Sequence, residues 1–130
     1  MRIVTAQSSA DRHGIILFGH GARDPEWAGP MQRIAARIAA LDPACPVSLA
    51  FMEFMRPTLD EAVDDLVARG VRSIRIVPVF LAQGGHLKRD VPLAVGRAAE
   101  RHPAVGLSLA TAAGEAEGVV EAIARYAIAP

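Results

Sequence analysis

Two stretches of this chain, about half its length apart, share the pattern Gly-His-x-x-Arg-Asp. Residues 19–24 read Gly-His-Gly-Ala-Arg-Asp, and residues 85–90 read Gly-His-Leu-Lys-Arg-Asp. An apolar run precedes each copy, so each histidine follows a segment typical of a buried strand. The chain must therefore fold so that two strands end near His20 and His86, and our interpretation of function depends on this pair.

Apolar runs and helical periodicities alternate along the rest of the chain. We predict strands over residues 14–18, 47–52, 73–81 and 105–110. We predict helices over residues 25–41, 58–70, 90–101 and 117–127. Pro78 has no N–H for a sheet ladder, so we expect a bend or a local gap in the third strand.

Local signals fix where the helices begin. Asp24 is a good N-cap, and Pro25 suits the first helical position. Thr58 and Glu61 have the spacing of a capping box. Asp90, which precedes Val91 and Pro92, is interpreted as a second cap of the Asp24 kind.

Helical spacing also predicts which side chains face the core. In the first helix these are Trp27, Met31, Ile34, Ile38 and Leu41. In the last helix they are Val120, Ile123 and Ala124.

Strands that alternate with helices predict an α/β fold with a parallel sheet and right-handed crossovers. We expect a flavodoxin-like three-layer sandwich with a four-stranded parallel sheet in the order 2-1-3-4. Strands 1 and 3 are then neighbours, so the loops that carry His20 and His86 meet at one edge. Strand 2 brings Glu53 to the same edge, which is where ligands bind in open α/β sheets.

Composition limits the class of protein. The 130 residues predict one domain over residues 14–130, preceded by a lead-in over residues 1–13. Basic and acidic side chains are equal in number, at 14 each, so we expect no nucleic-acid partner. No apolar run approaches the ~20 residues that span a bilayer, so we expect no membrane segment. Cys45 is the single cysteine, which excludes an internal disulfide and favours a cytoplasmic location.

Several side chains at the predicted edge suit metal or proton chemistry. Neutral imidazole binds Zn, Cu, Fe, Ni and Co ions and also accepts protons, so His20 and His86 are candidates for either role, with Glu53 beside them. Four basic side chains in the edge loops could bind ligand carboxylates: Arg23, Arg56, Lys88 and Arg89. Phe54 and Met55 follow Glu53 and could touch a ligand. The other two histidines, His13 and His102, are expected to be structural or exposed.

Three blocks of sequence together resemble the small sirohydrochlorin cobaltochelatases, which are short class II tetrapyrrole chelatases. The blocks are residues 18–23, residues 53–59 and residues 78–92, in this order. The resemblance implies a chelatase-like fold and insertion of a divalent metal (cobalt, nickel or iron) into sirohydrochlorin, without ATP, in cobalamin or siroheme synthesis. It also implies that His20 and His86 handle the metal, that Glu53 is an auxiliary carboxylate, and that the metal is a substrate with no cofactor permanently bound.

Two other functions remain open from the residues alone. The same edge could belong to a non-catalytic carrier of metal or tetrapyrrole, or to a plain interaction module. A flat tetrapyrrole on one open sheet edge would leave much of its surface in water, whereas pockets bury most of a ligand. We therefore expect a homodimer in which a second copy supplies the missing wall.

Overall fold

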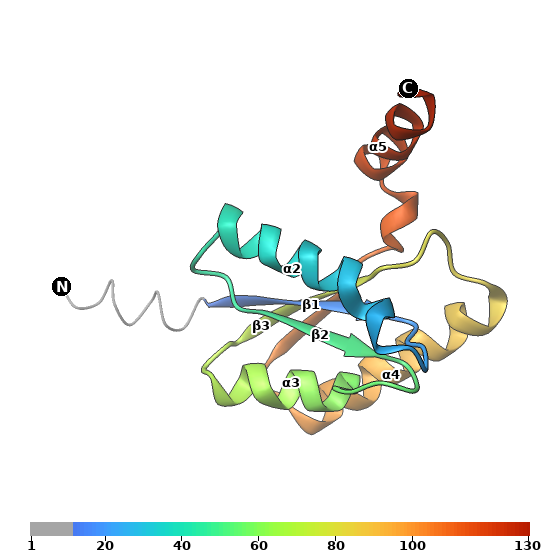
Figure 1. Ribbon diagram of the computed structural model, residues 1–130. Coiled ribbons are helices and arrows are strands. Elements are labelled where there is room, and N and C mark those ends of the chain that lie inside the picture. Colours follow the sequence, from blue (N-terminus) through green and yellow to red (C-terminus); the bar gives the residue numbers. More distant parts are fainter. Residues whose placement is uncertain (1–11) are drawn as a thin grey trace.

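The computed structural model describes residues 12–130 and contains a four-stranded parallel sheet with helices on both faces (Figure 1). The strands are β1 (His13–Gly19), β2 (Val47–Phe51), β3 (Ser73–Pro78) and β4 (Gly106–Leu109). Their order in the sheet is β2-β1-β3-β4, and all three pairings are parallel. The predicted strand order is therefore confirmed.

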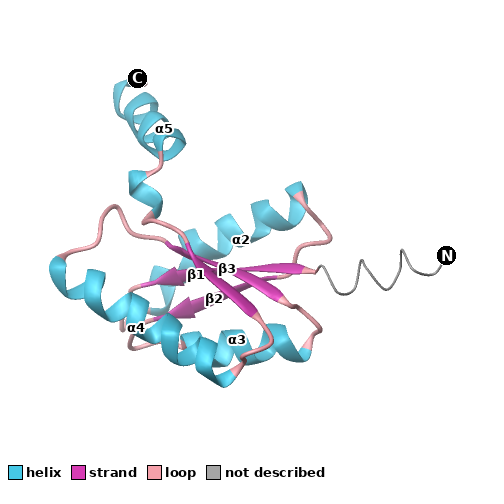
Figure 2. Ribbon diagram, turned by 180° about the vertical axis from the view of Figure 1, so that it is seen from behind, coloured by secondary structure: helices cyan, strands magenta, loops and turns pink. Residues whose placement is uncertain are grey.

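The helices form the outer layers. They are the 3₁₀ turn η1 (Pro25–Ala28), α2 (Gly29–Leu41), α3 (Leu59–Ala68), α4 (Gly85–Arg101), the 3₁₀ turn η2 (Ala113–Glu115) and α5 (Glu117–Ile128). One face of the sheet is covered by α2 and the other by α3 and α4, as Figures 1 and 2 show from opposite sides. This arrangement confirms the predicted three-layer α/β sandwich.

Each face of the sheet has its own apolar core, because successive strand residues point to opposite faces. Ile16 and Phe18 of β1 pack with buried side chains of α3 and α4. Leu17, between them, packs on the other face with Met31 of α2 and with Phe51. Both cores extend to the carboxyl ends of the strands, so the loops beyond those ends begin from well-packed residues.

Pro78 ends β3, so the strand is shorter than predicted. Pairing between β3 and β4 stops at Ile76 with Leu109. On the other side β1 continues to pair, and Val79 N donates to Phe18 O at 2.8 Å. Proline has no donor to extend the ladder, and it lies at the point where the pairing ends.

The predicted helix over residues 25–41 is divided into η1 and α2. Asp24 caps η1 by accepting from Glu26 N at 3.0 Å, as the sequence indicated. The predicted inner face is partly wrong: Met31 is buried and Ile38 packs on the core, whereas three side chains remain exposed: Trp27, Ile34 and Leu41. The reason is that, within residues 12–130, α2 packs mainly on β2 and β1, which leaves one of its flanks largely uncovered.

The start of α4 lies five residues before the predicted one. Its N-cap is Gly84, and Pro92 lies inside the helix. Asp90 is therefore a residue of the second turn, and its assignment as a cap was wrong. Asp and Pro two residues apart resemble a helix start, but this proline is tolerated within the helix instead.

The last helix departs most from expectation. The side chains predicted to face inward, Val120 and Ile123 among them, are exposed, and α5 has no buried residue. It stands away from the sheet on the side covered by α2 (Figures 1 and 2).

Two other predictions concern the lead-in segment and membrane-spanning helices. Most of the predicted lead-in over residues 1–13 lies outside the described residues, so the domain boundary remains a prediction. Within residues 12–130, no helix has both the length and the apolar character needed to cross a bilayer.

Candidate active site

His20 lies directly beyond the last residue of β1, at the carboxyl edge of the sheet. The preceding Gly19 is buried beneath α2, and a Cβ atom there would come within 2.5 Å of Met31 Sδ. A larger residue would force the thioether of Met31, a buried side chain of α2, to move. The glycine therefore lets α2 pack closely, and the strand ends with the His20 side chain 49% exposed.

Backbone hydrogen bonds join the loop after β1 to the loop after β2. Met52 N donates to Gly19 O at 3.0 Å, and Glu53 N donates to His20 O at 3.1 Å. The pairing of the two strands thus continues past their ends. Gly21, with φ of +97°, lies so close to the Glu53 carbonyl that a side chain on it would collide. Glycine is the residue that adopts this backbone conformation at low cost.

The two loops bring an imidazole and a carboxylate together. His20 Nε2 lies 3.3 Å from Glu53 Oε2, and both side chains are about half exposed. This contact is the predicted meeting of the first and second strand ends. The pair offers a nitrogen and an oxygen atom to a divalent metal, and both groups can accept a proton.

Phe80 is a contact of His20 that sequence reasoning missed. The two rings meet edge to face, with centroids 6.3 Å apart and planes at 66°. Phe80 also packs against the core, so it limits how far the imidazole can turn. Its place two residues beyond Pro78, at the end of a neighbouring strand, was the signal that could have identified it.

His86 lies in the first turn of α4, the helix that follows β3. Its Nε2 atom is 3.2 Å from Oδ2 of Asp90, four residues on, and its side chain is 76% exposed. The pairing exists because α4 begins at Gly85, which places both residues on one helix face. Asp90 is therefore a second residue of the site that the sequence interpretation missed.

The structure brings the predicted residues to one edge as two pairs. His20 pairs with Glu53, and His86 pairs with Asp90. Among residues 12–130, no three His, Cys, Asp or Glu side chains are placed to hold one metal ion together. Such an arrangement can take an ion on a histidine without enclosing it.

The basic side chains of the edge loops differ in how free they are. The guanidinium of Arg23 lies 4.5 Å from the centre of the exposed Phe54 ring. Arg56 forms an ion pair with Glu61, donating from Nε to Oε1 at 3.1 Å, in the capping box of α3. Lys88 and Arg89 are exposed in the first turns of α4. Arg56 is the weakest candidate of the four for binding a ligand carboxylate.

The hydrophobic candidates also separate. Phe54 is 55% exposed and has φ of +69°, a conformation that is uncommon outside glycine. Met55 is partly buried and packs on the core beneath α2. Phe54 is thus presented to solvent at the edge, whereas Met55 mainly supports the loop.

Three other titratable side chains lie outside the candidate site: His102, His13 and Cys45. His102 ends α4 and lies 2.7 Å from Asp64 Oδ1 of α3; this contact and Arg101 lower the pKa of Asp64. His13 is exposed at the opposite end of β1. Burial, with Asp42 nearby, raises the pKa of the Cys45 thiol, which disfavours the reactive thiolate.

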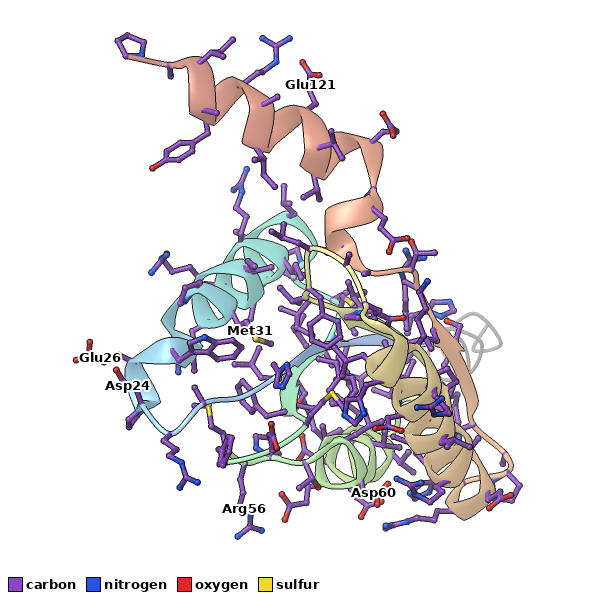
Figure 3. The ribbon with its side chains drawn as sticks, turned by 90° about the vertical axis from the view of Figure 1, so that its right-hand side faces the viewer. Asp24, Glu26, Met31, Arg56, Asp60 and Glu121 are labelled. Carbon is purple, nitrogen blue, oxygen red and sulfur yellow. The ribbon has the colours of Figure 1, made fainter. Side chains whose placement is uncertain are left out.

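A cleft of about 380 Å³ opens beside the second pair, between α3 and α4. Asp90 lines it, together with Thr58, Asp60 and Arg97, over an apolar floor that includes Phe18. Figure 3 looks onto this carboxyl edge, with Asp60 at the start of α3 and Arg56 pointing outward from the neighbouring loop. The His86–Asp90 pair therefore stands beside a concave surface.

A parallel α/β sheet whose carboxyl edge presents two histidine–carboxylate pairs defines a metal- or ligand-handling protein of the open-sheet class. A family model described as CbiX matches residues 14–128. The chain belongs to the CbiX family.

Curated relatives carry a more specific description. A sirohydrochlorin cobaltochelatase of Methanothermobacter thermautotrophicus is 41% identical over 91 residues, which are 68% of this chain and 63% of the relative. One from Methanococcus aeolicus is 38% identical over 82 residues, which are 63% of this chain and 57% of that protein. This chain thus matches about three-fifths of the length of these relatives.

Solved structures share the fold. A crystal structure of a CbiX protein described for cobalamin (vitamin B12) biosynthesis, from Marinobacter aquaeolei VT8, gives a TM-score of 0.78 at 32% identity. The match covers 88% of this chain and 93% of that one. The sirohydrochlorin chelatase SirB of Bacillus subtilis subspecies spizizenii, in complex with cobalt, gives 0.70 at 29% identity, over 88% of this chain and 49% of SirB.

Proposed function

We propose that this chain inserts a divalent metal, cobalt first and nickel or iron as alternatives, into sirohydrochlorin without ATP. The observation that carries the proposal is the His20–Glu53 pair, held at the sheet edge by backbone bonds between two loops. Support comes from relatives described as sirohydrochlorin cobaltochelatases and from a SirB structure in complex with cobalt. The metal is a substrate in this proposal, and no cofactor is required.

Metal insertion has a simple proton balance. The free macrocycle gives up two pyrrole protons, and the metal ion takes their place. The imidazole of His20 and the carboxylate of Glu53 can each accept one proton, and their separation of 3.3 Å lets both reach the same substrate centre. Both are half exposed, so the accepted protons can pass on to water.

His86 has a separate part in this proposal. Its exposed imidazole, with Asp90 behind it, can hold an incoming ion by a nitrogen ligand. Neither pair contains a thiolate, so the ion is held weakly enough to be released to the macrocycle. Arg23, Lys88 and Arg89 would meet the peripheral carboxylates of the tetrapyrrole.

The test is multiple-turnover insertion of Co, Ni and Fe into excess sirohydrochlorin, followed by absorbance. We expect product to exceed the protein concentration many times, faster than the reaction without protein. The control is His13→Ala, which removes an exposed imidazole at the opposite edge and should leave the rate unchanged. Product that stops at one equivalent would instead identify a carrier of metal or tetrapyrrole.

We also propose that two copies share the substrate. A single sheet edge leaves one side of a flat macrocycle open, and SirB is matched over only 49% of its length. A second copy would add its own His20 and His86 to one cleft. Phe54, Met55 and Leu87 are the candidate lining residues, and the exposed Phe54 is the strongest of them because Met55 and Leu87 pack on the cores. Mixing His20→Ala with His86→Ala subunits should then restore activity, whereas a fully active monomer would contradict a shared site.

The cytoplasmic location stays a prediction.

A further inference from the structure

Contacts join the loops at the carboxyl edge in the same order as the strands of the sheet. Gly114, which follows β4, donates from its N–H to Phe80 O at 2.8 Å, and Phe80 follows β3. The Phe80 ring meets the ring of His20, which follows β1, and His20 Nε2 lies 3.3 Å from Oε2 of Glu53, which follows β2. Because the sheet order is β2-β1-β3-β4, each step crosses to a neighbouring strand. We call these four residues the edge row.

The imidazole of His20 needs a neighbour that fixes its orientation. Rotation about the last side-chain bond of histidine has a broad energy profile, so the ring turns freely where little surrounds it. The His20 side chain is 49% exposed, and that of Glu53 is 52% exposed. Two exposed side chains restrain each other weakly. The direction of His20 Nε2 therefore depends on a further contact.

Phe80 supplies this contact from a fixed position. Its side chain is partly buried and packs on the core between the sheet and helices α3 and α4. It meets the His20 ring edge to face, an arrangement that aromatic rings favour because the positive edge of one faces the negative surface of the other. A phenyl ring binds no divalent metal and accepts no proton, so the contact leaves the His20 nitrogens to the reaction.

Backbone hydrogen bonds hold Phe80 from both sides. Val79 N donates to Phe18 O of β1 at 2.8 Å, so the residue before Phe80 is still bonded to the central strand. On the side of β4, Phe80 O accepts from Gly114 N. Strand β3 ends at Pro78, so these two bonds replace the sheet ladder beyond its end.

The turn η2 is packed tightly against the residue that follows Phe80. A Cβ atom on Gly114 would lie 2.2 Å from Leu81 O and 2.3 Å from Leu81 Cα, so only glycine fits. Ala112, just before η2, is buried. Figure 1 shows this segment, in orange, beside the yellow loop that leads from β3 to α4. The turn η2 therefore fixes the backbone on which the Phe80 ring is carried.

We infer that Phe80 is a positioning residue for metal insertion and that η2 acts on the reaction through it. Phe80 holds the His20 imidazole with Nε2 toward Glu53, and Gly114 holds Phe80, so the edge row works as one unit. The inference rests on the proposed function of His20 and adds two residues that act without touching the metal. A displacement of about 1 Å at a reacting group lowers a rate by about 10²-fold, which is how such residues affect catalysis.

The first test measures cobalt binding without any tetrapyrrole. Phe80→Leu keeps an apolar side chain and removes the ring, so the Kd for Co²⁺ should rise about tenfold, the upper range for loss of an aromatic pair. Phe80→Tyr keeps the ring and should retain the native Kd. The matched control is Val105→Ala, which removes packing from the same core at the opposite edge of the sheet. It should lower the melting temperature and leave the Kd unchanged. Native affinity in Phe80→Leu would overturn the inference.

A double-mutant cycle shows whether Phe80 acts through His20. In a His20→Ala background, Phe80→Leu should leave the Kd for Co²⁺ unchanged, because no imidazole remains to be positioned. Loss of affinity by the same factor in both backgrounds would identify a general structural effect and would overturn the inference.

Nuclear magnetic resonance tests the part played by η2. The Phe80 ring should displace the resonances of the His20 ring protons, and this displacement should be lost in Phe80→Leu. Gly114→Ala should change the same resonances, because its Cβ must move the Leu81 backbone. The control is Gly118→Ala, where a Cβ meets nothing within 4 Å, and it should leave them in place. Unchanged His20 resonances in Gly114→Ala would overturn the role assigned to η2.

Steady-state kinetics separates positioning from substrate binding. Phe80→Leu and Gly114→Ala should lower kcat for cobalt insertion about tenfold and leave the KM for sirohydrochlorin unchanged. A rise in KM with kcat unchanged would overturn the inference. The cobalt affinities and the His20 resonances do not depend on turnover. If the protein proves to be a carrier, they should still respond to Phe80→Leu, so failure of the proposed function is distinguishable from failure of this inference.

Discussion

The α-carbon of Gly21 faces the carbonyl oxygen of Glu53 so closely that a Cβ atom would lie 1.9 Å from it. No rotamer can relieve this contact, because both groups belong to the backbone. The orientation of Glu53 toward His20 therefore depends on a residue that has no side chain.

Gly21→Ala should separate the two loops. The left-handed φ of +97° costs alanine about 1–3 kcal/mol, and the collision adds to that cost. We expect a lower melting temperature together with a severe loss of metal insertion. The control is Gly96→Ala, within α4, where a Cβ meets nothing within 4 Å; it should gain about 0.5–1 kcal/mol of stability. Normal activity in Gly21→Ala would show that the loop contact is dispensable.

His20→Ala should lower the rate of metal insertion by about 10²-fold or more, the usual contribution of a proton-accepting side chain. His86→Ala should also abolish most insertion, because the incoming ion loses its nitrogen ligand. Both side chains are exposed, so thermal unfolding should change little. Glu53→Gln should have a milder effect with the fold intact. Near-normal turnover in either alanine variant would remove that histidine from the site.

Lys88→Gln and Arg89→Gln should each raise the KM for sirohydrochlorin about tenfold, since a hydrogen bond to a charged group contributes about 1.5 kcal/mol or more. Arg56→Gln should raise it less, because Glu61 already holds that guanidinium. Steady-state kinetics at fixed metal concentration checks the order. The control is Arg72→Gln at the opposite edge. A larger effect from Arg56 than from Lys88 and Arg89 would reverse our ranking.

The acid stability of the fold should depend on Glu61. The side-chain hydrogen bond with Arg56 lowers the pKa of Glu61 from 4.5 to about 2, so the folded state favours the ionised carboxylate. This contribution is present above pH 4.5 and is lost as pH falls toward about 2. Glu61→Gln keeps an amide at the capping position and should flatten the decline of melting temperature over this range. Glu100→Gln, outside the capping box, should retain the decline of the native chain.

Short-range signals predicted most of the fold. The apolar runs of the strands, the Asp24 cap and the Thr58–Glu61 capping box each depend on neighbouring residues, and the structure contains all of them. The meeting of His20 with Glu53 followed from the strand order. Two signals misled because their outcome depends on distant packing: Pro92 suggested a helix start, and the stripe of α5 suggested burial in the same chain.

The contacts that no local pattern encodes were the ones missed. Asp90 pairs with His86 only because α4 begins earlier than its start signals indicate. Phe80 reaches His20 across two neighbouring strands. Ile34 and Leu41 are exposed because, within residues 12–130, α2 packs mainly on β2 and β1.

The proline inside α4 has a consequence for how the first turn of that helix exchanges its amide hydrogens. Pro92 offers no N–H to the carbonyl of Lys88, so the turn that carries His86 is joined to the remaining helix by one hydrogen bond fewer. The free energy of local opening should therefore be lower around residues 88–91 than around residues 94–101, so the amides of residues 88–91 should exchange faster with solvent. A metal ion bound to the His86–Asp90 pair would stabilise this turn and raise its free energy of opening. Slower amide exchange in this turn would therefore report metal binding in the absence of any tetrapyrrole.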